Sequence, residues 1–145
     1  MVSLGDFFSD LEKQKFASRA IGRGSILRLK VEGIDHEKIV VVLGISKKKA
    51  LVGTVYINTN KRRGSRLPYQ VALGFEGREE YLNYTSFVDC GRIHELSLPK
   101  VQNQLKIDTE VYQADILEDD LIDIMQTVKG ATTIPLVYKK RYGIV

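Results

Sequence analysis

The chain has 145 residues, of which 43% are hydrophobic and 28% charged, a balance typical of one folded domain and unlike that of disordered or fibrous proteins. Its single cysteine, Cys90, excludes an internal disulfide, and no apolar run approaches the ~20 residues that a bilayer crossing needs. The first residues lack the basic and apolar regions of a signal peptide, so we expect a soluble, cytoplasmic protein without a membrane partner.

The net charge of +4 is unevenly distributed along the chain. Residues 38–75 contain no acidic residue and eight basic ones, namely Lys38, Lys47, Lys48, Lys49, Lys61, Arg62, Arg63 and Arg66. The charged residues of segment 76–123, in contrast, are mostly acidic. This asymmetry favours a surface that binds a polyanion. The alternative is a solvated surface whose charges balance in three dimensions.

The chain begins with a segment that is predicted to be helical, roughly residues 4–20. Ser9 and Glu12 have the spacing of a capping box, and Gly22 or Gly24 ends the helix. The sequence leaves open whether this helix docks on the domain or forms an arm.

Strands are predicted through the middle of the chain. Apolar and charged residues alternate over 27–31, which indicates a half-buried strand, and the β-branched run 39–43 indicates a strand buried on both faces. Further strands are predicted at 50–57, 69–75, 86–90 and 92–96. A tight basic turn at 46–49 and a basic loop at 61–66 connect neighbouring strands.

Helices are predicted in the later part of the chain. Ser97 is expected to cap a short helix with Pro99 in its first turn. A brief strand at 110–114 precedes the clearest helix, 117–128, whose apolar residues repeat on one side. The tail, residues 132–145, alternates weakly and is predicted to be a strand or an arm.

Short successive strands before a late helix predict a mainly β, α+β fold. We expect a small antiparallel SH3-like barrel with a C-terminal helix and an N-terminal helical extension. The predicted organisation is an extension over residues 1–22, a barrel domain over 23–131 and a C-terminal arm over 132–145.

Motifs for nucleotide binding, zinc-dependent hydrolysis and serine nucleophiles are absent from the sequence. Asp119 and Asp120 lie in the first turn of a predicted helix, where carboxylates complement the helix dipole more often than they bind metal. We therefore expect neither a metal nor another cofactor. His36 lies in a polar connection and is a candidate acid or base, because histidine titrates near neutral pH. His94 and Cys90 are expected to be structural.

Two connections of the predicted barrel are expected to meet. The segment before Lys38 and the loop 58–66 emerge from the ends of adjacent strands, so Lys38, Thr59 and an arginine of the loop would lie beside a bound phosphodiester. RNA carries its own nucleophile, the 2′-hydroxyl. Metal-independent cleavage therefore needs only a proton acceptor, a proton donor and cations for the charged transition state.

Segments of the chain resemble, in this order, the MazF/PemK family of bacterial toxins over about residues 24–131. They are the opening strand GSILRL (24–29), the apolar run EKIVVVL (37–43), the threonine-containing loop VYINTN (55–60), the strand LPYQV (67–71), the strand pair SFVDCGRIHEL (86–96) and the terminal helix (117–128). The chain departs from the family at Lys38-Ile39, which replaces Arg-Pro, and at His94, which replaces the arginine of Gln-Ile-Arg.

The resemblance implies a metal-independent endoribonuclease that cleaves single-stranded RNA, forms a homodimer and is neutralised by an antitoxin protein in a type II toxin–antitoxin system. Matching positions place the family's catalytic arginine on Lys38 and its loop threonine on Thr59, with His36 as a further catalytic candidate. The residues expected to bind RNA are Asn58, Asn60, Lys61, Arg62, Arg63, Arg66, Lys47 and Lys48.

The departures from the family pattern leave two alternatives open. One is a non-catalytic barrel that binds nucleic acid or a protein partner, since lysine cannot present arginine's bidentate fork to a phosphate. The other is a toxin that acts on a protein target, as the CcdB family acts on DNA gyrase.

Overall fold

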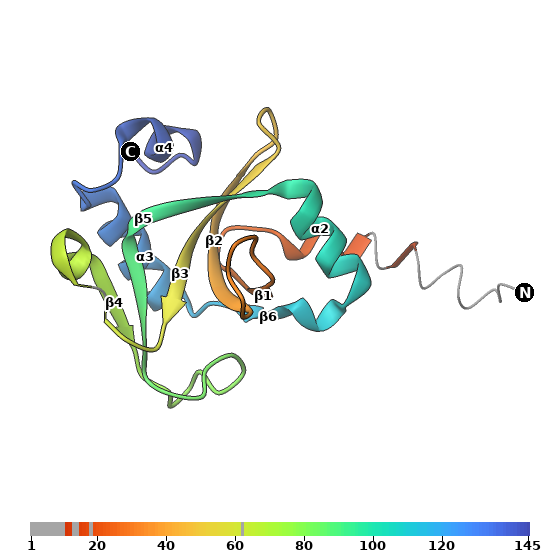
Figure 1. The fold of residues 1–145 in the computed structure, drawn as a ribbon, viewed down its shortest axis with the longest axis horizontal. Helices are drawn as coiled ribbons and strands as arrows, with labels where there is room; N and C mark the ends of the chain where they lie inside the picture. Colours follow the sequence, from red (N-terminus) through yellow and green to blue (C-terminus); the bar gives the residue numbers. More distant parts are fainter. Residues whose placement is uncertain (1–10, 13–14, 18, 62) are drawn as a thin grey trace, which may run out of the picture.

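A computed structural model describes residues 11–12, 15–17, 19–61 and 63–145 (Figure 1). Within this part of the chain, six antiparallel strands form one curled sheet in the order β4-β5-β3-β2-β1-β6. The strands are β1 (Ser25–Leu29), β2 (Lys38–Ser46), β3 (Leu51–Asn58), β4 (Gln70–Leu73), β5 (Ser86–Ser97) and β6 (Tyr112–Asp115). The edge strands β4 and β6 are not neighbours in this order, so the sheet is an open half-barrel.

Helices pack against the sheet and complete the α+β fold that the sequence predicts. They are α2 (Leu98–Ile107), α3 (Glu118–Gly130) and α4 (Leu136–Arg141), with the 3-10 turns η1 (Gly64–Tyr69) and η2 (Thr109–Val111). The Ser97 hydroxyl accepts a hydrogen bond from the Lys100 amide, which confirms the predicted cap of α2. Within the described residues, no helix combines the length and the apolarity that crossing a membrane would require.

The sheet buries apolar side chains on both of its faces. On the face that α3 covers, called here the α3 face, Val41, Val55 and Val88 pack in one cluster with Ile124 and Val128 of the helix. Because side chains alternate along a strand, the intervening residues point to the opposite face. This alternation explains why β2 and β3 have continuous apolar runs instead of an alternating pattern.

The opposite face, called here the α2 face, carries the second cluster. Val40 and Val52 pack there with Val101 and Leu105 of α2. The described residues between 11 and 20 are helical, and Ala17 and Ala20 are buried in the same cluster. The described part of the predicted N-terminal helix therefore docks on the domain. Ser9, one half of the predicted capping box, lies outside the described residues.

Two segments of the middle of the chain differ from their predictions. The strands predicted on either side of Gly91 are one strand, β5, which pairs with β3 before and after a bulge. Glycine suits this bulge because a Cβ at Gly91 would approach the Arg66 side chain to 2.8 Å. The basic loop predicted at 61–66 includes the start of η1, which begins at Gly64.

The tail also differs from its prediction, because it forms helix α4 and packs into the core instead of forming a strand or an arm. Tyr138 of α4 and its C-cap residue Tyr142 are four residues apart, so the helix places both on one side, against the α3-face cluster. Ile134, which precedes the helix, packs in the same cluster. Pro135 precedes the helix and has the backbone angles of its N-cap.

Tyr142 anchors the tail to the β2–β3 hairpin. Its ring lies over the paired glycines Gly44 and Gly53, and its hydroxyl donates to Glu95 Oε2 at 2.7 Å. Burial and this acceptor both raise the pKa of the Tyr142 hydroxyl. Arg23 donates to the Tyr142 carbonyl, so the segment is bound from two sides.

The space for Tyr142 depends on Gly53. A Cβ at this position would lie 2.6 to 2.8 Å from three ring atoms of Tyr142, so we expect Gly53→Ala to lower the free energy of unfolding by about 1–3 kcal/mol. Gly130→Ala is the matched control, because no atom lies within 4 Å of the added Cβ, and its effect should stay within about 1 kcal/mol. Urea unfolding measures both, and equal stabilities of the two variants would contradict this role of Gly53.

Candidate functional site

The pairing of β2 with β3 brings the two predicted turns together. Ile39 is opposite Ile57, which places Lys38, the first residue of β2, beside Asn58, the last residue of β3. The Lys38 ammonium donates a hydrogen bond to Asn58 Oδ1. The connection before Lys38 and the loop after Asn58 therefore lie at the same end of the sheet, as the strand order predicts.

A cleft of about 380 Å³ lies between these two connections. Its lining contains six of the predicted site residues together with one carboxylate, and comprises His36, Glu37, Lys38, Ile39, Ile57, Asn58, Thr59, Asn60 and Lys61. The cleft thus combines ammonium, amide, hydroxyl and imidazole groups. These are the groups that can bind a phosphodiester and move protons beside it.

Two side chains of the cleft have polar groups suited to a ligand. His36 is exposed, and its Nδ1 lies 3.1 Å from Asp35 Oδ1; this hydrogen bond lowers the pKa of the Asp35 carboxyl. When Nδ1 donates in this contact, Nε2 is the ring nitrogen of the neutral imidazole that is left as an acceptor. The Asn58 Nδ2 group is buried and makes no hydrogen bond to any described residue. A buried donor of this kind favours an acceptor oxygen brought by water or a ligand.

Other predicted RNA-binding residues lie away from the cleft. Lys47 and Lys48 are in the turn that joins β2 to β3, where Ser46 pairs with Leu51 (Figure 1). At ~3.3 Å per residue, the nine residues of β2 place this turn on the order of 25 Å from the cleft. Lys47 and Lys48 therefore lie outside the cleft of their own molecule, and their part in RNA binding stays a prediction. Arg62 lies outside the described residues.

Arg63 and Arg66 flank the start of η1 and differ in environment. Arg63 is exposed, whereas the Arg66 guanidinium donates to Asp89 Oδ2 at 2.9 Å. Asp89 is 1% exposed and also accepts from the Gly91 amide. A buried carboxylate needs such partners, so Arg66 attaches η1 to β5 instead of extending into solvent.

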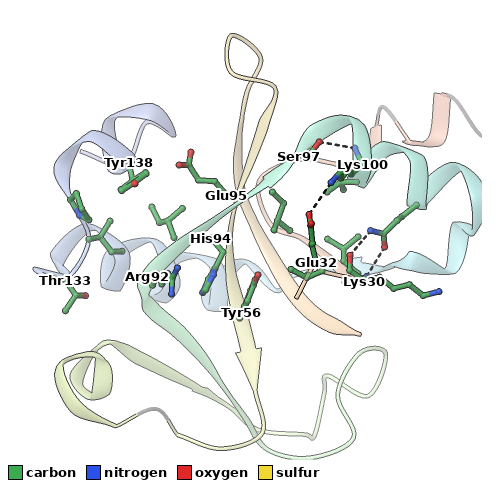
Figure 2. A pocket seen from close by; sticks show the side chains of 18 residues that line it. Lys30, Glu32, Tyr56, Arg92, His94, Glu95, Ser97, Lys100, Thr133 and Tyr138 are labelled. Carbon is green, nitrogen blue, oxygen red and sulfur yellow. Dashed lines mark hydrogen bonds and ion pairs between the residues drawn. The ribbon is translucent and has the colours of Figure 1, made fainter. Parts of the chain in front are cut away.

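A larger groove adjoins the cleft on the α2 face. It has a volume of about 640 Å³ and crosses β5 between α2 and the segment 133–138 (Figure 2). Tyr56, Arg92 and His94 lie side by side on its floor (Figure 2). The Tyr56 and His94 rings are stacked at 3.6 Å, and the Lys38 ammonium lies 5.4 Å from the centroid of the Tyr56 ring. Lys38 therefore connects the cleft to the groove.

This groove is not predictable from the sequence. His94 was expected to be structural and Arg92 was not expected in a site, because polar residues within one predicted strand do not indicate a common open surface. The available signal was their position in β5, an interior strand whose polar residues 92, 94 and 95 interrupt its apolar pattern. The described residues contain no group of three acidic, histidine or cysteine side chains arranged to hold a metal. Asp120, considered above for metal binding, is paired with Arg78 at 2.7 and 2.8 Å.

Solved structures with the same fold are known. An endoribonuclease from a mycobacterial species matches with a TM-score of 0.52 and 18% identity, over 80% of this chain and 94% of its own. A mycobacterial endoribonuclease in complex with its cognate antitoxin matches with a TM-score of 0.51 and 18% identity, over 79% of this chain and 96% of its own. No protein-family model and no curated protein matches the sequence.

The class defined by these observations is an α+β protein with a half-barrel sheet and a basic cleft at one end of it. At 18% identity the match demonstrates a shared fold, and the structure confirms the small barrel-like α+β fold that the sequence predicts. Activity does not follow from the fold itself.

The different environments of the two arginines can be tested by substitution. Arg66→Ala removes the cation beside a buried carboxylate, so we expect the free energy of unfolding to fall by about 2–4 kcal/mol. Arg63→Ala, at an exposed position three residues away, should change it by no more than about 0.5 kcal/mol. Chemical denaturation of both variants gives the comparison, and an unchanged stability of the Arg66 variant would contradict its structural role.

Proposed function

We propose that this protein is a MazF/PemK-type toxin, an endoribonuclease that cleaves single-stranded RNA without a metal ion as part of a type II toxin–antitoxin system. The observation that carries the proposal is the meeting of Lys38, Asn58 and Thr59 in one cleft with His36 at its edge. The fold shared with a mycobacterial endoribonuclease supports it.

The proposed reaction uses the RNA's own 2′-hydroxyl. This oxygen forms a bond to the adjacent phosphorus while the bond from phosphorus to the 5′-oxygen breaks, leaving a 2′,3′-cyclic phosphate and a 5′-hydroxyl. The proton of the 2′-hydroxyl passes to His36 Nε2, and the departing 5′-oxygen takes a proton from the surrounding groups or water. Lys38 and the hydroxyl of Thr59 stabilise the extra negative charge on the phosphate oxygens.

Asn58 both positions Lys38 and binds the substrate in this proposal. Its Oδ1 accepts from the Lys38 ammonium, which leaves its buried Nδ2 as a donor for a phosphate oxygen. Lysine is a point charge, so the amide supplies the second directed hydrogen bond that an arginine fork would otherwise provide. Lys61, at the other side of the cleft, extends the positive surface along the RNA strand.

The proposed partners are single-stranded RNA, a second copy of the chain and an antitoxin protein. A mycobacterial structure with this fold is a complex of an endoribonuclease with its cognate antitoxin. The absence of acidic residues from segment 38–75 favours an antitoxin whose binding segment is acidic.

RNA cleavage tests the proposed activity. We expect the purified protein to cut single-stranded RNA in the presence of EDTA and to leave 5′-hydroxyl ends. Lys38→Ala should reduce the cleavage rate about 100-fold or more, because it removes a charge that acts on the transition state. End-mapping of the products from both proteins by sequencing provides the measurement.

Lys106→Ala is the control, since it removes an exposed positive charge from α2, whose residues do not line the cleft. It should retain the wild-type rate. Equal cleavage by wild type and the Lys38 variant would overturn the assignment of Lys38. RNA that is bound by the wild type but never cut would instead support the non-catalytic binding module.

The proposed homodimer is tested separately by sedimentation. We expect analytical ultracentrifugation at micromolar concentration to give a species of twice the 16.4 kDa chain mass. A single monomeric species across the concentration range would contradict this part of the proposal, whatever the outcome of the cleavage assay.

A further inference from the structure

Phe87 lies in line with the cleft residues across the sheet. It pairs with Asn58 on one side and with Ala72 of β4 on the other. Because directly opposite residues share a face, Lys38, Asn58, Phe87 and Ala72 form one row on the α2 face. With strands ~4.8 Å apart, the Phe87 and Lys38 backbones are about 10 Å from each other.

The Phe87 ring belongs to neither hydrophobic cluster of the described residues. This is unusual for a phenylalanine in an interior strand, because such a residue normally fills a core. Helix α2 and the described part of the N-terminal helix cover the α2 face over other residues, those of the Val40 and Val52 cluster. The Phe87 ring is half-buried, and its neighbour Ala72 is small and exposed.

A lysine of the cleft lies over the Phe87 ring. The Lys61 ammonium is 5.4 Å from the ring centroid, within the range of a cation–π contact. Lys61 also lines the cleft, so its flexible side chain has both the ring and a phosphate within reach. An aromatic ring beside a cation is the arrangement by which proteins stack unpaired bases and hold the adjoining backbone.

We propose that Phe87 is a stacking platform for a nucleobase of the RNA strand next to the phosphate held at Lys38 and Asn58. This inference rests on the proposed function for its substrate and assigns a subsite to it. When RNA binds, the base lies on the Phe87 ring, and the Lys61 ammonium moves from the ring to the flanking phosphate. The platform stacks any base, because each has a π face, and so contributes affinity and positioning more than sequence preference.

The experiment is a binding titration with a single-stranded RNA that contains 2-aminopurine and carries 2′-O-methyl groups, which prevent cleavage. Stacking on an aromatic ring quenches the fluorescence of 2-aminopurine, so the wild type should quench it. Phe87→Leu, which keeps an apolar side chain, should lose most of the quenching and bind about tenfold more weakly. Phe87→Tyr should retain both, which also guards against an effect of misfolding.

Two further variants separate the ring from other effects. Phe75→Leu changes a partly exposed phenylalanine outside this row and should bind as the wild type does. Lys61→Met should keep the quenching but lower the slope of log affinity against log salt by about one, as expected for one lost phosphate contact.

The outcomes distinguish this inference from the proposed function. If the wild type cuts RNA and Phe87→Leu binds and quenches as the wild type does, the platform is overturned and the nuclease stands. If the wild type never cuts RNA but the quenching depends on Phe87, the platform stands and the nuclease falls. Failure of the wild type to bind RNA at all overturns both.

Discussion

The register between β2 and β3 is the constraint on which the rest of the site depends. It sets Lys38 against Asn58 and so joins two connections that are twenty residues apart in the chain. Side chains alternate along a strand, so a slip of one residue would turn Asn58 away from Lys38 and move the apolar residues of the slipped strand from one cluster to the other, where they do not fit. The two clusters, one on each face, therefore fix the geometry of the cleft from a distance.

The site owes its openness to unequal coverage of the sheet. The α3 face is covered by α3 and α4. The α2 face is covered over β1 and the neighbouring parts of β2 and β3, while Asn58, Phe87 and His94 lie beyond the cluster that α2 completes. A curled sheet with one partly covered face thus provides a rigid floor for polar and aromatic side chains. Backbone pairing, more than loop conformation, determines where these side chains lie.

The strands and the clearest helix were predictable because their signals are local. The β-branched run of β2 and the helical repeat of α3 depend on neighbouring residues alone, and the meeting of the two turns follows from strand order. The tail was not predictable in this way, since α4 is only six residues long and a weak alternation of apolar and polar residues in the tail suggested a strand instead. The break predicted at Gly91 was a bulge, which sequence cannot distinguish from a turn when the long-range partner is unknown.

The residues of the candidate site were likewise predictable where their position depends on local sequence, and unpredictable where it depends on contacts between distant segments. Lys38 and Asn58 were predictable because they end paired strands. Arg66 and Lys47 were included in the predicted site because they are charged, but charge alone does not say where a side chain lies. The Arg66 guanidinium is bound by the buried Asp89 carboxylate, and Lys47 lies in the turn at the far end of the β2–β3 hairpin.

The contacts among Gly91, Arg66 and Asp89 limit which substitutions the chain can accept during evolution. A side chain at position 91 needs the volume that Arg66 fills, and a shorter residue at position 66 deprives the Asp89 carboxylate of its cation. Homologous chains should therefore carry these three residues together or replace all three, so that their covariation marks descent with this same bulge.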